Sequence, residues 1–265
     1  MNNKIIDILK KVIASLLVIV ILISFWQIVE DNVNQIREEN KETSLEYFIP
    51  SPKSIMYSFV ADFNIIQNAI LSTLIKAIPG FIVGVFLAIL MAILYIIIPS
   101  FRNATFGIAY ALNSFPLVGL APIIILMFGQ GSFLSIMFVV MLVSYFPMLI
   151  TLDGALNQTP REYIELMKIN KATKFKTLIY ARIPLAMPQF FVSLRLSIPS
   201  SIVGAIIGEW MGASEGIGRL MILSVYQMEA GRLYACMFAV AIICATTAIL
   251  IEYISRKVLF WNNTK

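Results

Sequence analysis

The sequence contains no histidine, only two cysteines and few charges, with charged residues at 13% of its 265 positions. Cys236 and Cys244 lie eight residues apart in an apolar segment, a spacing that fits neither a zinc site nor a disulfide framework. We interpret both as small core residues. Paired carboxylates within apolar segments and a nucleophile with a matching base are also missing, so neither an enzyme nor a metal site is expected. Because no basic patch is interleaved with aromatic residues, nucleic acid is not an expected partner.

Apolar residues, by contrast, make up 59% of the chain. One water-soluble core of this length could not bury so much apolar surface, so part of the chain must face lipid. A spanning helix needs about 20 mostly apolar residues. Six segments qualify: 12–29, 77–98, 104–127, 133–152, 189–211 and 233–254. We therefore predict an all-α membrane protein with six transmembrane helices.

Lysine and arginine are distributed unequally over the two sides that these spans define. With the N-terminus inside, thirteen of them fall on the inner side and five on the outer side. Cytoplasmic loops retain positive charge, so both termini are predicted to be cytoplasmic. The remaining two, Lys76 and Arg195, fall near span ends and are expected to extend toward the interface. On the outer side, Ser51 before Pro52 predicts the start of a short helix.

Small residues recur at every fourth position in two predicted spans. One stripe consists of Gly80, Gly84 and Ala88, and the other of Ser200, Gly204, Gly208 and Gly212. Such stripes let two helices approach closely in lipid. We expect the first stripe to pack within the chain, whereas the second is compatible with packing within the chain or between two copies.

Four polar residues in the predicted spans are candidates for a solute pathway: Asn113, Ser114, Ser200 and Glu209. Asn113 and Ser114 either bond between helices or contact solute. Glu209 lies in the segment GEWMGASEGIG, where the helical pattern ends. Its carboxylate either faces a water-filled vestibule and meets solute, or caps a re-entrant turn.

One long polar insert, residues 154–188, interrupts the apolar pattern on the predicted cytoplasmic side. Apolar residues at helical spacing predict two short amphipathic helices there. Asn170 and Lys171 separate them, because asparagine accepts the left-handed conformation that ends a helix, and Thr173 is placed to cap the second helix. Two prolines are expected to stop that helix before the next span: Pro184 and Pro188.

Acidic residues in the insert bear on its partner. A cytoplasmic helix pair beside a membrane could lie on anionic lipid, but such a surface is typically basic. Glu162 and Glu165 lie on the first predicted helix. Docking to another protein is therefore the preferred interpretation.

The insert resembles the cytoplasmic loop of permease subunits of binding-protein-dependent ABC importers. That loop carries EAA, three residues, Gly, nine residues and I-x-L-P. Here Glu165-Leu166-Met167 stands at the EAA positions, Lys171 at the glycine and Ala181-Arg182-Ile183-Pro184 at the last four. The spacing is kept throughout, although the residues agree only at Glu165 and Pro184, with Ile183 a near match. The resemblance implies that an ATPase binds a set of insert residues: Glu162, Glu165, Leu166, Met167, Asn170, Lys171, Phe175 and Pro184.

Further segments extend the resemblance over nearly the whole chain. IPSPKSI, SFPLVGLAPIIILMFGQG and GEWMGASEGIGRLM are similar to permeases of the nitrate, sulfonate and taurine type. IELM combined with IVGAIIGEWMGAS is more similar to members that import the pyrimidine precursor of thiamine. The resemblance implies an N-terminal helix and extracytoplasmic segment over 1–63, a permease domain over 64–259 and a place in the bacterial plasma membrane.

Energy for transport must come from another subunit, because the sequence has no GxxxxGK[ST] phosphate loop. The resemblance implies cytoplasmic ATPase subunits that hold ATP and Mg, an extracytoplasmic solute-binding protein and a second permease copy in a homodimer. No cofactor is expected in this chain. An ion-gradient-driven secondary transporter is the alternative class, although mid-membrane ionisable residues and repeated halves are not evident. Nitrate, sulfonate and riboflavin-like solutes are the alternatives to the pyrimidine.

Overall fold

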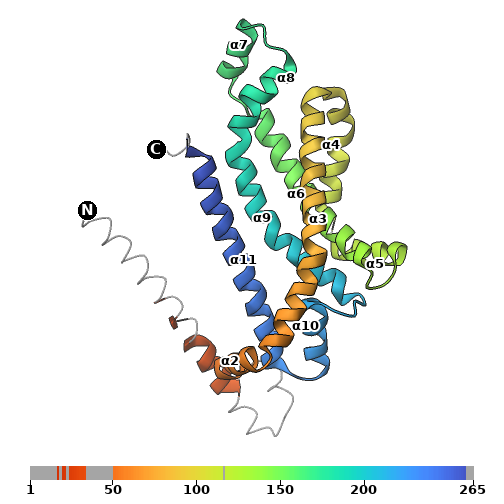
Figure 1. The fold of residues 1–265 in the computed structure, drawn as a ribbon, viewed down its shortest axis with the longest axis vertical. Helices are drawn as coiled ribbons and strands as arrows, with labels where there is room; N and C mark the ends of the chain where they lie inside the picture. The colour runs from red at the N-terminus through yellow and green to blue at the C-terminus, as the bar shows by residue number, and fades with distance from the viewer. Residues whose placement is uncertain (1–16, 18–19, 22–23, 34–49, 116, 261–265) are drawn as a thin grey trace, which may run out of the picture. The chain divides into compact units, whose positions relative to one another are not determined.

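The computed structural model describes residues 17, 20–21, 24–33, 50–115 and 117–260, which contain helices and no strand. Residues 24–33 are helical, and half of the predicted span 12–29 lies outside the described residues. The other helices are, in order, α2 (Pro52–Ala61), α3 (Phe63–Ile97), α4 (Pro99–Ser114), α5 (Leu117–Phe128), α6 (Phe133–Asn157), α7 (Arg161–Ile169), α8 (Lys174–Thr177), η2 (Leu178–Arg182), α9 (Ile183–Trp210), α10 (Ile217–Tyr226) and α11 (Ala230–Val258) (Figure 1). By their contacts, the residues form two compact units: Met1–Ile66 with Met221–Phe238, and Gln67–Leu220 with Ala239–Lys265.

Among the described residues, four helices are long and apolar enough to cross a membrane. They are Phe63–Ile97, Phe133–Asn157, Lys174–Trp210 and Ala230–Val258. The first is 35 residues long and begins well before the predicted position 77. At about 1.5 Å per residue it extends roughly 52 Å, which exceeds a hydrocarbon core of about 30 Å.

The predicted span over 104–127 is not one continuous helix in the structure. Helices Pro99–Ser114 and Gly119–Phe128 meet at an angle of 103°, so they count as a fifth span only as a broken pair. Phe115, which follows α4, has φ −73° and ψ 136°. This extended backbone is the conformation that a residue before proline prefers, and Phe115 precedes Pro116. The proline therefore ends α4 instead of merely kinking a longer helix.

In the second unit, α3 packs directly against α6 through its small residues. A Cβ atom added at Gly80 would lie 2.5 Å from the carbonyl oxygen of Met137, and one at Gly84 would lie 2.6 Å from that of Met141. Backbone therefore meets backbone at both positions. The 80–88 stripe packs within the chain, as predicted.

α6 and α9 lie side by side in the same unit (Figure 1). Gly204 and Gly208 of the second stripe face Val143 and Ile136 of α6. Toward the other end of the pair, α6 and α9 residues form a buried cluster that includes Met148. The 200–212 stripe thus contributes to packing within the chain.

The first unit contains the predicted short helix α2. Ser51 caps it, because its Oγ accepts the N–H of Ser54 at 3.0 Å, and Pro52 is the first helical residue. Asp62 follows α2 and receives a hydrogen bond from Arg232 Nε at 2.8 Å. Cys236 is buried in this unit with a free thiol, as expected of a core residue.

Candidate functional site

The predicted polar insert forms a helical hairpin in which α7 and α8 are joined by a short turn beyond the ends of α6 and α9 (Figure 1). Neither α7 nor α8 contains a buried residue. Large apolar side chains are exposed along the segment: Tyr163, Leu166, Ile169, Phe175, Ile179 and Tyr180. Ile169 and Tyr180 are 79% and 72% exposed. We call the exposed face of residues 161–180 the docking surface, because apolar patches of this kind mark sites of protein association.

Charges of both signs surround these apolar side chains. Glu162 and Glu165 are exposed on α7, and Lys168 lies in its last turn. An acid in the first turn and a base in the last turn complement the helix dipole. The mixed charge differs from the uniformly basic face of a lipid-binding helix, so it favours a protein partner.

The turn between α7 and α8 differs from the prediction at one residue. Asn170 has φ −78° and ψ 10°, whereas Lys171 adopts the left-handed conformation with φ 52°. The N–H of Ala172 bonds to the carbonyl of Met167, and the N–H of Lys171 to that of Lys168, both at 2.9 Å. This is a Schellman motif.

The physical reason for the shift is a side-chain bond of Asn170. Its Nδ2 donates to the carbonyl of Leu166 at 2.8 Å, which holds Asn170 as the helix cap. The left-handed residue is therefore the next one, Lys171. This is the position at which the resembled loop has glycine, the residue that adopts this conformation at least cost.

The second helix begins as predicted but does not stop where predicted. Thr173 Oγ1 accepts the N–H of Lys176 at 3.3 Å and caps α8. The chain then stays helical through the π-helical turn Leu178–Arg182 into α9, so Pro184 and Pro188 do not end it. In the π-turn the N–H of Ile183 bonds five residues back to Leu178. This wider turn accommodates Pro184, whose ring would otherwise collide with the carbonyl four residues earlier.

The base of the docking surface is fixed to α6. Leu178 and Ala181 are buried, and Arg182 Nη1 donates to the carbonyl of Leu156 at 2.7 Å, one residue before α6 ends. All eight residues predicted to bind an ATPase therefore belong to one continuous segment. Six are exposed, while Met167 and Pro184 are half-buried.

Glu209 lies at the last turn of α9 and is completely buried. Thr73 Oγ1 lies 2.8 and 3.0 Å from its two carboxylate oxygens, and the N–H of Gly218 donates to Oε2 at 2.9 Å. Gly216 has φ 126°, and a Cβ there would collide with the carboxylate. These contacts are those of a residue that caps the turn between α9 and α10, the structural one of the two predicted roles.

Lys76 completes this cluster. Its Nζ lies 3.4 Å from Glu209 Oε1 and donates to the carbonyl of Glu215 at 2.8 Å. Arg195 also has an acidic partner, because its Nη1 lies 2.5 Å from Glu252 Oε2. The sequence gives one signal for this ion pair, because Arg195 and Glu252 have opposite charges and lie in two different predicted spans.

The other solute-pathway candidates lie apart from this cluster. Asn113 and Ser114 are in the last turn of α4, where the Ser114 hydroxyl donates to the carbonyl of Tyr110 at 3.1 Å. The Ser200 hydroxyl donates to the carbonyl of Leu196 at 3.2 Å. Within the described part of the chain, Glu209 forms no hydrogen bond with Asn113, Ser114 or Ser200.

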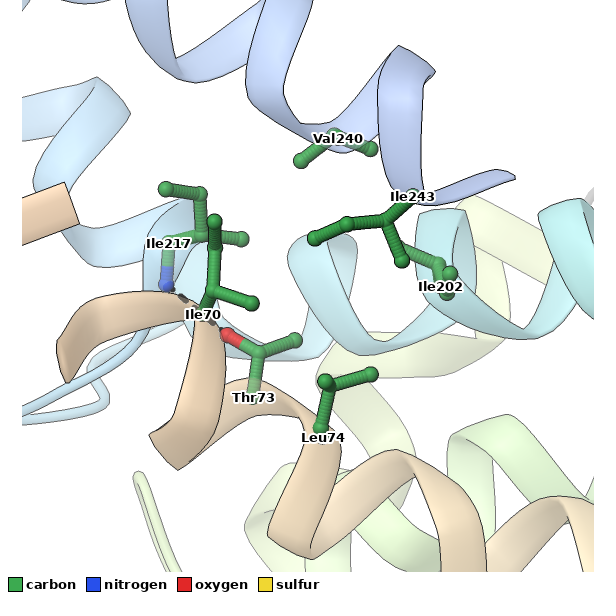
Figure 2. Close-up of a pocket in the computed structure, with 7 residues that line it drawn as sticks. All are labelled: Ile70, Thr73, Leu74, Ile202, Ile217, Val240 and Ile243. Atoms are coloured by element: carbon green, nitrogen blue, oxygen red, sulfur yellow. Dashed lines mark hydrogen bonds between the residues drawn. The ribbon is translucent and has the colours of Figure 1, made fainter. Parts of the chain in front are cut away.

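A small pocket with a cavity volume of about 10 Å³ adjoins the Glu209 cluster (Figure 2). It is lined by Ile70, Thr73, Leu74, Ile202, Ile217, Val240 and Ile243. Its one hydroxyl, Thr73 Oγ1, accepts the N–H of Ile217 at 2.8 Å and already contacts Glu209. The pocket is about the size of one water molecule and is too small for a solute. Within the described part of the chain, no group of acidic or cysteine side chains could hold a metal ion.

Comparison with known proteins identifies similar sequences over most of the chain. Residues 80–260 match the profile of the family described as binding-protein-dependent transport system inner membrane component. A probable ABC transporter permease protein of Haemophilus influenzae is 24% identical over 250 residues, covering 94% of this chain and 98% of that protein. The formylaminopyrimidine transport permease protein ThiX of Halalkalibacterium halodurans is 27% identical, covering 82% of this chain and 86% of ThiX.

Two solved structures share the fold. A chain of an amino acid ABC transporter crystallised with histidines matches with a TM-score of 0.61 and 13% identity, covering 76% of this chain and 96% of that chain. A chain of the inward-facing MetNI methionine ABC transporter matches with a TM-score of 0.54 and 17% identity, covering 77% and 95%.

Proposed function

The chain belongs to the family of binding-protein-dependent transport system inner membrane components, and we propose that it moves a small solute into the cell while a separate ATPase supplies the energy. As the permease component of an ABC transporter it is a multi-pass membrane protein and not itself the ATPase. ATP and Mg belong on the partner subunit, and the chain itself needs no cofactor.

The docking surface is the observation that carries this proposal. It presents exposed Leu166 and Phe175 among charges of both signs, and α7 contains no fully buried residue. Burial of such apolar side chains against a partner stabilises association by roughly 25 cal/mol per Å² before the costs of binding are subtracted. We assign this surface to the ATPase subunit, with Glu165 at its charged rim.

A continuous helix supports a mechanical connection between the ATPase and the membrane. Lys174–Trp210 is 37 residues long, which corresponds to about 55 Å. Closure of two ATPase subunits would displace the docking surface, and α9 would carry this displacement into the membrane. The solute would then be exposed alternately to the outer and inner sides, without any chemical change.

The assembly and topology follow from the same proposal. We propose six transmembrane helices with both termini in the cytoplasm, an N-terminal segment over 1–63 and a permease domain over 64–259. Two copies would pair as a homodimer in the bacterial plasma membrane, and an extracytoplasmic solute-binding protein would deliver the solute. The segment 12–29 would be the first of the six helices.

For the solute we propose the pyrimidine precursor of thiamine. Similarity to ThiX supports this choice. The ion pairs support it too, because Lys76, Arg102, Arg195 and Arg232 each have a carboxylate oxygen within 3.4 Å. None of these four cations is free to attract an anion such as nitrate or a sulfonate, which suits a neutral solute better.

The test of the proposed function is a charge reversal on the docking surface. Glu165→Lys should abolish co-purification of the ATPase and lower ATP-dependent uptake about tenfold or more, because a reversed charge in an interface is repelled by the groups that accommodated the acid. Asp31→Lys, an exposed acid in the helix 24–33, is the matched control and should leave both unchanged. Uptake should require ATP on the side of the membrane where the ATPase binds. Uptake by proteoliposomes that contain this chain alone and a proton gradient would instead identify a secondary transporter.

A further inference from the structure

The π-turn Leu178–Arg182 connects two parts of the chain that must be aligned. The docking surface precedes it, and the membrane-spanning part of α9 follows it. An α-helix turns by about 100° and rises 1.5 Å per residue. One extra residue in a turn therefore rotates everything before it by about that angle relative to everything after it.

The two faces of the π-turn have opposite environments. On one face Leu178 and Ala181 are buried, and Arg182 donates to the Leu156 carbonyl at the end of α6. On the other face Ile179 and Tyr180 are exposed and continue the docking surface. A rotation about the helix axis would exchange these environments.

Pro184 explains why the wider turn occurs here. In a regular α-helix, residue 184 would donate to the carbonyl of Tyr180, but proline has no N–H and its ring would meet that oxygen. The structure has the bond from the Ile183 N–H to Leu178 instead. Pro184 is thus a positioning residue for the π-turn.

We propose that the π-turn sets the rotational register between the docking surface and α9, and that Arg182 locks this register by binding to α6. The proposal rests on the proposed function, because the register matters only if an ATPase grips the docking surface. The π-turn then determines which face of the hairpin a motor bound to it meets. Arg182 ensures that displacement of the hairpin reaches α6 and α9 together.

The first experiment removes one residue from the turn. Deletion of Tyr180 together with Pro184→Ala converts the segment to a regular α-helix and rotates the docking surface by about 100°. The protein should still insert, but ATPase co-purification and uptake should fall about tenfold or more. Tyr180→Ala as a single change keeps the residue count and Pro184, and it should retain far more activity than the deletion. Uptake by the deletion variant equal to that of the natural chain would overturn the proposal.

The second experiment substitutes one side chain and deletes no residue. It therefore tests the proposal even if the deletion variant does not accumulate. Arg182→Gln removes the cationic donor to Leu156, whereas Arg182→Lys retains one. The glutamine variant should transport several-fold less solute per ATP hydrolysed while the ATPase still co-purifies, because the grip is intact but the connection to α6 is loosened. The lysine variant should transport nearly as much solute per ATP hydrolysed as the natural chain. An unchanged ratio in the glutamine variant would contradict the lock.

Measurements on the natural chain distinguish a failure of the proposed function from a failure of the register proposal. If it neither binds an ATPase nor requires ATP for uptake, the proposed function itself fails. If it does both, and the deletion and glutamine variants match it in uptake per ATP, only the register proposal fails.

Discussion

At the scale of single residues, two positions depend on backbone conformation or burial that few other residues would tolerate. Lys171 is left-handed at φ 52°, a conformation that costs an L-residue with a Cβ about 1 kcal/mol. The Schellman bonds around it offset this cost. Glu209 is buried with both carboxylate oxygens engaged.

The Glu209 cluster predicts a stability difference between two conservative changes at Thr73. Thr73→Val removes the hydroxyl that contacts the carboxylate and leaves the buried N–H of Ile217 without its acceptor, which costs about 1 to 3 kcal/mol. Thr73→Ser keeps the hydroxyl and should behave almost as the natural chain. The measurement is the thermal unfolding midpoint of both variants in the same detergent.

A solute-contacting role for Glu209 would give a different result. Glu209→Gln would then change the concentration dependence of uptake without lowering the unfolding midpoint. We expect the midpoint to fall, because the change leaves Lys76 without its carboxylate.

At the scale of helices, close approach between α3 and α6 depends on the absence of side chains. Gly80 and Gly84 bring backbone of α3 against carbonyl oxygens of α6. Lipid supplies no hydrophobic force between helices, so this packing is a principal source of their association. Gly107, in α4, has no neighbouring atom within 4 Å of a Cβ placed on it.

These glycines predict opposite outcomes for the same substitution. Gly80→Ala should destabilise the protein by roughly 1 to 3 kcal/mol, because the methyl group would overlap a backbone oxygen that cannot move away alone. Gly107→Ala should be neutral or stabilising by up to about 1 kcal/mol, since alanine favours the helix. Unfolding midpoints and the yield of folded protein measure both. Equal loss at the two positions would refute the packing argument.

At the scale of the whole molecule, the pairing of basic with acidic side chains affects which solutes the protein can transport. Ion pairs within the described parts of the candidate spans occupy Lys76, Arg102 and Arg195. An isolated charge inside a membrane is costly, and pairing removes much of that cost. Pairing also removes the attraction that an anionic solute would need.

Competition for uptake tests this consequence. In cells that produce the chain with its ATPase and binding protein, labelled formylaminopyrimidine should enter in an ATP-dependent manner. A large excess of nitrate or an alkyl sulfonate should leave the initial rate unchanged, because Lys76, Arg102 and Arg195 already have carboxylate partners. Inhibition by these anions, with no effect of excess unlabelled pyrimidine, would reverse the assignment of the solute.

Local sequence signals predicted some features of the structure correctly. Ser51 before Pro52 predicted the start of α2, and Thr173 predicted the cap of α8. The small-residue stripe at 80–88 predicted close packing. Each of these depends on residues within one or two turns of a helix, so their spacing alone carries the information.

Other features depend on residues far apart in the sequence or on competition between two conformations. Thr73 and Glu209 are separated by 136 positions, and no local pattern connects them. Proline near 184 was expected to end a helix, but a π-turn accommodated it because the flanking residues pack on α6. The cap at Asn170 likewise displaced the left-handed residue to Lys171.

The docking surface has a further consequence for the life of the protein after synthesis. A newly made copy without its partner displays Ile169, Phe175 and Tyr180 to water. Chaperones and quality-control proteases bind exposed apolar segments of this kind, and aggregation begins at the same places. If the proposed ATPase covers this surface, we expect the chain to accumulate poorly when made alone and much better when made together with that ATPase.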